Sequence, residues 1–146
     1  MTLKSVQTAI GNFNSIYSNA GLMALEFIGQ KSSNYPADLN LQKLMDIFFT
    51  NSKAIHLPPL DLQGSNFQLK VWKALSNIPS GKTESYKSLA EKVGSPNAAR
   101  AVGTACKYNP IPLLIPCHRA VKQDGSIGEF ALGSHNKKFL LELEQE

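Results

Sequence analysis

The segment from Asn109 to Arg119 constrains the fold of this chain more than any other. It contains three prolines and an apolar run, Ile111 to Ile115, and it ends with Cys117, His118 and Arg119 in succession. Proline fixes φ and excludes helix geometry, so the sequence predicts a stiff, extended and buried segment. A thiol at the end of such a segment, with an imidazole beside it, indicates a nucleophile.

A buried cysteine is more often a small hydrophobic residue than a nucleophile, and that interpretation has to be weighed first. Two features favour reactivity. His118 and Arg119 are polar where an apolar run would otherwise continue, and neither is expected to be buried without a partner. An acidic helix near the C-terminus also offers a partner for His118.

The composition is that of an ordinary globular protein of 146 residues, with a net charge of +4 and a pI near 9.1. This charge suits a polyanionic partner but does not establish one. Two cysteines, Cys106 and Cys117, are too few for a disulfide framework and fit a reducing compartment. With no leader and no apolar run that could span a bilayer, we expect a cytoplasmic monomer that makes no membrane contact.

The first 60 residues predict a small αβ domain that serves as a scaffold. Strands are expected over Thr8 to Phe13 and over Gly21 to Ile28, where apolar residues occupy both faces. A helix is expected from Leu41 to Phe48, with Asp38 as its N-cap. A proline-rich linker, His56 to Gly64, follows.

Residues 64 to 146 predict a second, mostly helical domain. Ser65 and Gln68 match a capping box at the start of a helix that Pro79 to Gly81 ends. Ser85 is expected to cap a short helix that ends near Lys92, Ser95 to cap a second that reaches Ala105, and Ser134 to cap the last. Ala120 and Val121 form a candidate short strand, and Phe139, Leu140 and Leu143 are expected to face inward. The chain is therefore assigned to the α+β class.

The two short helices are joined by a glycine-containing turn, which is typical of a helix-turn-helix. This pattern alone is weak, because many helical hairpins bind nothing. It is sharpened by Arg100, which stands among small residues on the second helix, and by Lys107 just beyond its end. Such a helix surface can approach another body closely.

Taken together and in order, these motifs resemble the O(6)-alkylguanine-DNA alkyltransferases, also called methylated-DNA–protein-cysteine methyltransferases. The resemblance runs from about Gly64 to Glu144, and the first sixty residues match only loosely and look short for the family. The motifs that carry it are Phe67–Trp72, Ile78–Gly81, Ser85–Tyr86, Ala98–Gly103, Asn109–Pro110, Pro116–Arg119 and Gly128–Phe130. The resemblance implies a winged-helix-like helix-turn-helix and an active-site loop in the C-terminal domain.

The resemblance also implies a reaction. A DNA-repair methyltransferase of this kind binds duplex DNA that carries an alkylated base, rotates the guanine out of the stack and transfers its O(6)-alkyl group to Cys117, once per molecule. It places the activation of the thiol on His118, acting through a water, and on Glu144, with Asn109 fixing the loop. Neither a metal nor a cofactor is implied, and O(4)-alkylthymine is a possible second substrate.

The same resemblance implies which residues contact DNA and the flipped base. Arg100 is the candidate finger that fills the gap in the stack, and Tyr86 is expected to crowd the 3′ phosphate. The remaining DNA contacts are Ala99, Lys107 and Arg119, and the base pocket is expected to include Phe130, Ala131 and Pro112. The family often has tyrosine where this chain has Phe130, so we expect a lower or differently tuned rate.

Several alternatives stay open at this stage. Alkyltransferase-like proteins bind alkylated DNA without accepting the group, but they lack the acceptor cysteine that is present here. A cysteine hydrolase usually draws its cysteine and histidine from separate elements, and a plain helix-turn-helix regulator needs neither. The residues that could ligate a metal, which are Cys106, Cys117, His56, His118 and His135, lack paired ligand spacing. Cys106 and Trp72 are assigned to packing.

Overall fold

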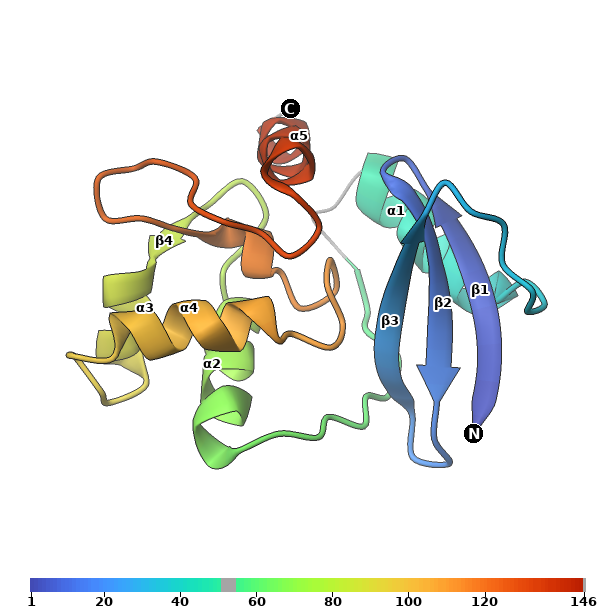
Figure 1. The fold of residues 1–146 in the computed structure, drawn as a ribbon, viewed down its shortest axis with the longest axis horizontal. Coiled ribbons are helices and arrows are strands. Elements are labelled where there is room, and N and C mark those ends of the chain that lie inside the picture. The colour runs from blue at the N-terminus through green and yellow to red at the C-terminus, as the bar shows by residue number, and fades with distance from the viewer. Residues whose placement is uncertain (51–54, 146) are drawn as a thin grey trace. The chain divides into compact units, whose positions relative to one another are not determined.

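The computed structural model describes residues 1–50 and 55–145, and the chain forms two units, Met1–Leu62 and Gln63–Glu146. Figure 1 labels their helices and strands. The architecture mixes helices with small sheets, as predicted. Within the described residues, every helix is too short to cross a membrane.

The first unit is a three-stranded antiparallel sheet with one helix. Its strands β1 (Thr2–Thr8), β2 (Gly11–Tyr17) and β3 (Leu22–Gly29) are neighbours in that order, and α1 (Leu39–Thr50) packs on β1. The core of the unit contains Val6, Phe13, Leu25, Met45 and Phe48. The predicted helix and its cap are confirmed, since Asp38 Oδ1 accepts a hydrogen bond from Leu41 N at 3.2 Å.

The predicted strand from Thr8 to Phe13 was wrong, because a hairpin turn lies inside it. Thr8 ends β1 and Gly11 begins β2. Thr8 Oγ1 donates to Gly11 O at 2.6 Å and accepts from Ile10 N at 3.3 Å, so a threonine side chain builds the turn. Gly11 adopts φ 137°, and a Cβ there would lie 2.8 Å from the Phe27 ring. The predicted strand from Gly21 to Ile28 is confirmed as β3.

The second unit begins with α2 (Asn66–Ser76), whose capping box between Ser65 and Gln68 is confirmed. The helix buries Val71, Trp72 and Leu75, and Trp72 Nε1 donates to Ala105 O at 3.0 Å. This bond satisfies the indole N–H and ties α2 to the helix that carries Ala105.

A short parallel sheet pairs β4 (Glu84–Ser85) with β5 (Ala120–Val121), which places the end of the proline-rich segment beside the start of α3 (Tyr86–Lys92). Ser85 caps α3 as predicted, accepting from Ser88 N at 3.0 Å. The helix α4 (Ala99–Lys107) packs on α3 and α2.

Two predicted helix caps were wrong. Ser95 does not cap α4, because its carbonyl accepts from Ala98 N in a turn that precedes the helix. Ser134 is the first residue of α5 (Ser134–Glu144) rather than its cap, and Gly133 takes that place with φ 97°. On α5, the buried residues are Lys137, Leu140 and Glu144, whereas Phe139 is 40% exposed. The inward face is therefore more polar than predicted.

Candidate active site

The proline-rich segment is buried as predicted, but it is folded back on itself rather than extended. Ile115 N donates to Ile111 O at 2.9 Å, and Leu113 between them has φ 75°. Asn109 closes this loop, because its Nδ2 donates to Ile115 O at 2.7 Å and its Oδ1 accepts from Ile111 N at 2.9 Å. Prolines exclude a helix, but they are compatible with a tight loop when a side-chain amide forms hydrogen bonds with the backbone groups of the loop.

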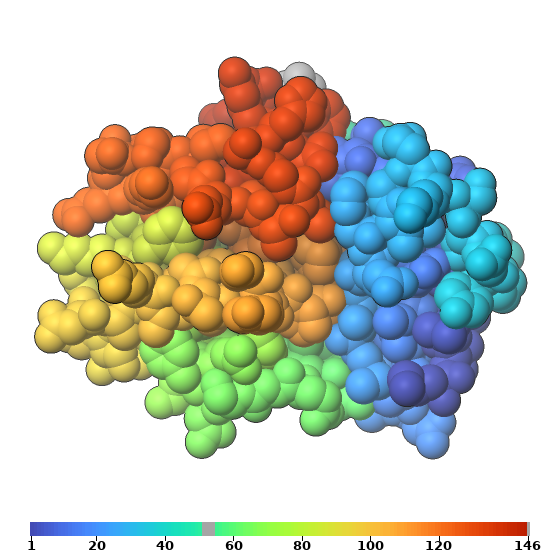
Figure 2. Space-filling view, viewed as in Figure 1, coloured from blue at the N-terminus to red at the C-terminus, as the bar shows by residue number. Residues whose placement is uncertain are grey.

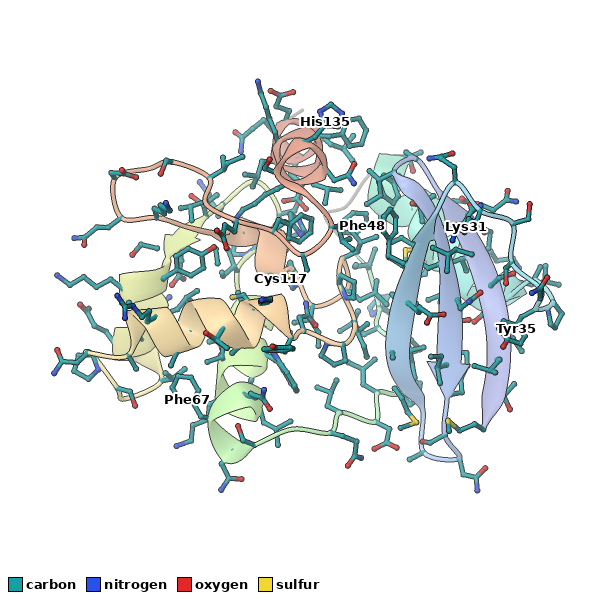
Figure 3. The ribbon with its side chains drawn as sticks, in the orientation of Figure 1. Lys31, Tyr35, Phe48, Phe67, Cys117 and His135 are labelled. Atoms are coloured by element: carbon teal, nitrogen blue, oxygen red, sulfur yellow. The ribbon has the colours of Figure 1, made fainter. Side chains whose placement is uncertain are left out.

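The loop delivers Cys117, His118 and Arg119 as a single 3₁₀ turn, and all three are buried. Three residues of such a turn point in different directions around its axis. Cys117 faces a cavity of the second unit, whereas His118 and Arg119 reach Glu144 on α5. In Figure 3 the labelled Cys117 lies beside α4.

Glu144 binds both His118 and Arg119 in one buried cluster. Its Oε2 lies 3.0 Å from His118 Nε2 and 2.6 Å from Arg119 Nη2, and its Oε1 accepts from Arg119 Nε at 3.0 Å. Burial acts to raise the pKa of Glu144, but the hydrogen bonds from His118 and Arg119 outweigh it and lower this pKa to about 2. Glu144 is therefore a carboxylate at neutral pH.

His118 is neutral in this cluster, because complete burial lowers its pKa despite the nearby carboxylate. A carboxylate only accepts hydrogen bonds, so the proton of the neutral ring belongs on Nε2, facing Glu144. This tautomer leaves Nδ1 as the basic nitrogen of the ring.

Arg119 does not lie on the surface, where a DNA contact would require it. It is 7% exposed, it binds Glu144 through two nitrogens, and its Nη1 donates to Ile78 O at 2.7 Å. The predicted DNA contact of Arg119 was wrong because a carboxylate 25 residues away in the sequence, together with a backbone carbonyl, holds the side chain in the interior.

Lys137 on α5 is a component of the site that sequence reasoning missed. Its side chain is fully buried, and Nζ donates to Ala120 O at 2.6 Å, to Glu129 O at 3.3 Å and to the Tyr86 hydroxyl at 3.4 Å. All these partners are neutral. Burial lowers the pKa of Lys137, while the Cys117 and Cys106 thiols act to raise it. Its spacing from Leu140 and Glu144 placed it on the inward helix face, which was the signal available in the sequence.

A cavity of about 520 Å³ opens beside Cys117, within the second unit. The predicted site residues that line it are Tyr86, Ala99, Arg100, Lys107, Cys117, Phe130 and Ala131. Cys106, Lys122 and Glu129 line it as well, and none of these was predicted. Pro112 is buried in the loop and is not among the residues that line this cavity, so its place in the base pocket stays a prediction.

The cavity floor and rim differ in character. Cys117 is 4% exposed at the floor, and burial raises the pKa of its thiol, while the amide of Asn109 and the charge of Lys137 oppose that shift. The cationic residues at the rim, Arg100, Lys107 and Lys122, are all exposed. Figure 2 shows α4, in gold, open on the viewed face of this unit, with the segment 122–133 above it.

The chain is similar to proteins of a known family. A family model described as "6-O-methylguanine DNA methyltransferase, DNA binding domain" matches residues 66–146. A methylated-DNA–protein-cysteine methyltransferase of Methanosarcina barkeri is 36% identical over 149 aligned positions, which cover 96% of this chain and 94% of that protein. The chain belongs to this methyltransferase family.

Other relatives of the family match a smaller share of their own length. A mycobacterial methyltransferase from Mycobacterium tuberculosis is 49% identical over 86 residues, 59% of this chain and 52% of that protein. The chain thus aligns with about half of that relative. The crystal structure of M. tuberculosis OGT in complex with DNA has a TM-score of 0.89 at 33% identity and covers 99% of this chain and 93% of its own.

An alkyltransferase-like protein also matches in part. The S. pombe Atl1 structure, in complex with damaged DNA containing O6-carboxymethylguanine, has a TM-score of 0.51 at 34% identity and covers 56% of this chain and 78% of its own. The methyltransferase family therefore accounts for more of the chain than the alkyltransferase-like protein does.

Phe130 forms part of the cavity wall. The Phe130 and His118 ring centroids lie 6.3 Å apart in an edge-to-face arrangement, so Phe130 walls the cavity against the buried imidazole. The ring offers an apolar face to a base but no hydroxyl to donate.

Proposed function

We propose that this protein repairs duplex DNA by moving the alkyl group of O(6)-alkylguanine onto the sulfur of Cys117, once per molecule. The observation that carries the proposal is the buried Cys117 thiol at a cavity large enough for a base, with a buried imidazole–carboxylate pair formed by the next residue, His118, and Glu144. The family membership of the chain and the likeness to the OGT–DNA complex support it. We expect it to act as a monomer in the cytoplasm.

The reaction is an in-line displacement at the alkyl carbon. The bond from Cys117 Sγ to this carbon forms while the bond from the carbon to O6 breaks, and the electron pair of that bond stays on the guanine. The attacking species is the thiolate. Because burial raises the pKa of Cys117, the thiol needs a general base that removes its proton as the alkylated guanine enters the cavity.

His118 supplies that base. Its Nδ1 takes the thiol proton through one water, as the family resemblance implies, and the ionised Glu144 on Nε2 stabilises the imidazolium that results. Lys137 has no carboxylate partner in the described structure, so its charge is directed at the nearby sulfur. Both groups stabilise charge that appears only when the thiolate forms.

The DNA-facing surface follows from α4 and the cavity rim. We infer that Arg100 occupies the gap left by the extruded base and that Tyr86 crowds the adjacent phosphate. Lys107 and Ala99 lie along the DNA backbone. Small residues on α4 let the helix approach the minor groove closely, and the exposed cations supply affinity that weakens with salt. Little base-specific readout is expected, because the minor-groove pattern is degenerate.

The test is mass spectrometry of the full chain after incubation with a duplex that contains O(6)-methylguanine. One added methyl group, mapped to the peptide that contains Cys117 and absent from Cys117→Ser, is the expected result. Methyl transfer to another residue, or several lesions cleared per molecule, would overturn the proposal. Tight binding to the lesion without any methyl transfer would instead support an alkyltransferase-like role.

A further inference from the structure

A second thiol lies in the same cavity as the acceptor cysteine. Cys106, on the last turn of α4, is 8% exposed and lines the cavity together with Cys117. Both cysteines are reduced in the structure. The sequence predicted only a packing role for Cys106. Its place in the cavity wall puts it in the same cavity as Cys117, a thiol with which it can react.

The two thiols converge on the same pair of polar groups. The Lys137 ammonium acts on both sulfurs and lowers the pKa of each, although burial dominates and raises the pKa of Cys106 to about 12. Both thiols also contribute to raising the pKa of Tyr86, although burial is the larger cause, and the Tyr86 hydroxyl lies 3.4 Å from Lys137 Nζ. Both sulfurs border one cavity, and the charge of the Cys117 thiolate acts to raise the pKa of Cys106, so the two groups interact across it.

The cavity also gives a small oxidant access to the acceptor. Although Cys117 is 4% exposed, it lines an opening of about 520 Å³, far larger than a peroxide molecule. A thiolate stabilised by a nearby cation is the form that peroxides oxidise. An acceptor built to react with carbon is therefore vulnerable to oxidation.

We propose that Cys106 is a resolving cysteine, which traps oxidised Cys117 as an intramolecular Cys106–Cys117 disulfide and so protects the acceptor in a reversible, inactive form. The loss of alkyl-acceptor activity in that form rests on the function proposed above. The thiol chemistry itself does not depend on it.

The steps balance with a peroxide as the two-electron oxidant. The Cys117 thiolate attacks one peroxide oxygen, the O–O bond breaks, and Cys117 becomes a sulfenic acid while the other oxygen leaves as hydroxide and is protonated to water. The Cys106 sulfur then attacks the Cys117 sulfur, the S–OH bond breaks, and a second water leaves with the thiol proton. Two thiols and one hydrogen peroxide thus give one disulfide and two waters.

The test treats the full native chain with hydrogen peroxide and needs no DNA. The expected result is a loss of two hydrogen atoms from the intact mass, a crosslinked peptide pair that contains Cys106 and Cys117, and a full return to the starting mass with dithiothreitol. In Cys106→Ser, Cys117 is expected to gain oxygen atoms and to pass to sulfinic acid, which dithiothreitol does not reverse.

A functional arm compares each variant with its own untreated sample. Methyl transfer should be lost in both proteins after peroxide and regained on reduction only in the wild type. Sulfinic acid on Cys117 in the wild type without a crosslink, or a crosslink only between molecules, would overturn the proposal. If neither protein transfers methyl before treatment but the crosslink forms, the proposed function fails and the thiol pairing stands.

Discussion

At the scale of single residues, Lys137 has an unusual environment for a lysine. Among residues 1–50 and 55–145, its fully buried ammonium is bound by two backbone carbonyls and a hydroxyl and by no carboxylate, although lysine is almost never buried without a charged partner. The cost of desolvating it is offset where a negative charge develops nearby, and Cys117 is the group that acquires one. We therefore infer that the Lys137 ammonium favours formation of the Cys117 thiolate through its charge.

We predict that Lys137→Met slows the reaction of Cys117. Removing the ammonium raises the pKa of the thiol further, and each unit of pKa lowers the thiolate fraction tenfold, so the rate near neutral pH should fall by about tenfold or more. The measurement is the pH profile of Cys117 alkylation by a small thiol reagent. The profile should shift to higher pH in Lys137→Met but not in Lys138→Met, the exposed neighbour. An unshifted profile would show that Lys137 is only structural.

The second residue-scale prediction concerns Phe130. A tyrosine at this position would add a donor near the leaving oxygen, and a net hydrogen bond contributes about 1 kcal/mol, so Phe130→Tyr should raise the rate about fivefold. Single-turnover methyl transfer is the measurement, with the exposed Phe139→Tyr on α5 as the matched control. An equal rate in all three proteins would make the missing hydroxyl irrelevant.

At the scale of elements, α4 combines two roles. Val102, Ala105 and Cys106 are buried, and Cys106 lines the cavity, while Arg100 is exposed at its rim. One helix thus anchors the fold through its inner face and presents a cation through its outer face. A substitution at Arg100 should therefore weaken the action on duplex DNA without changing the reactivity of Cys117 at the cavity floor.

We predict that Arg100→Ala separates two substrates. Extruding a base costs a few kcal/mol, so without the side chain that fills the gap the repair of duplex DNA should fall by about 10- to 100-fold. Reaction with a free O(6)-alkylguanine base should be retained. The rates on both substrates are measured alongside Lys138→Ala, an exposed cation on α5 that does not line the cavity. Equal losses on duplex and free base would reject the finger role.

The elements also show where sequence reasoning succeeds. The capping box of Ser65 and the cap of Ser85 depend on residues within three positions, and both were predicted. The hairpin at Thr8 was missed because a threonine side chain builds its turn and because Gly11, with φ 137°, was placed inside a strand. The cap at Ser95 was misplaced because the serine forms a turn one step before the helix.

At the scale of the whole molecule, burial of the His118–Glu144 pair should make the protein sensitive to acid. The folded state holds the pKa of His118 below the ordinary 6.5, so the unfolded chain binds this proton first and stability falls as the pH drops below about 6.5. The pKa of Glu144 is about 2 rather than 4.5, so a further contribution, about 3 kcal/mol, is present above pH 4.5 and lost as the pH falls toward 2.

The measurement is the free energy of unfolding in denaturant between pH 8 and pH 3. We expect a decline that begins below about pH 6.5 and steepens below pH 4.5. Glu144→Gln should flatten the lower part and should cost about 3–5 kcal/mol at neutral pH, because Arg119 is then left buried without its carboxylate. A flat profile in the wild type would contradict the buried, neutral state of His118.

By itself, the sequence determined that Cys117 ends a stiff buried segment, that short capped helices surround it, and which family the motifs resemble. These features are local, because proline, caps and helix periodicity act within a few residues. Only the tertiary structure decided that the segment folds back through Asn109, that Arg119 turns inward to Glu144, that Lys137 is buried against Ala120 O, and that Cys106 lines the same cavity as the acceptor. Each of these depends on burial and on partners distant in the chain, and desolvation acts only once the fold has brought those partners together.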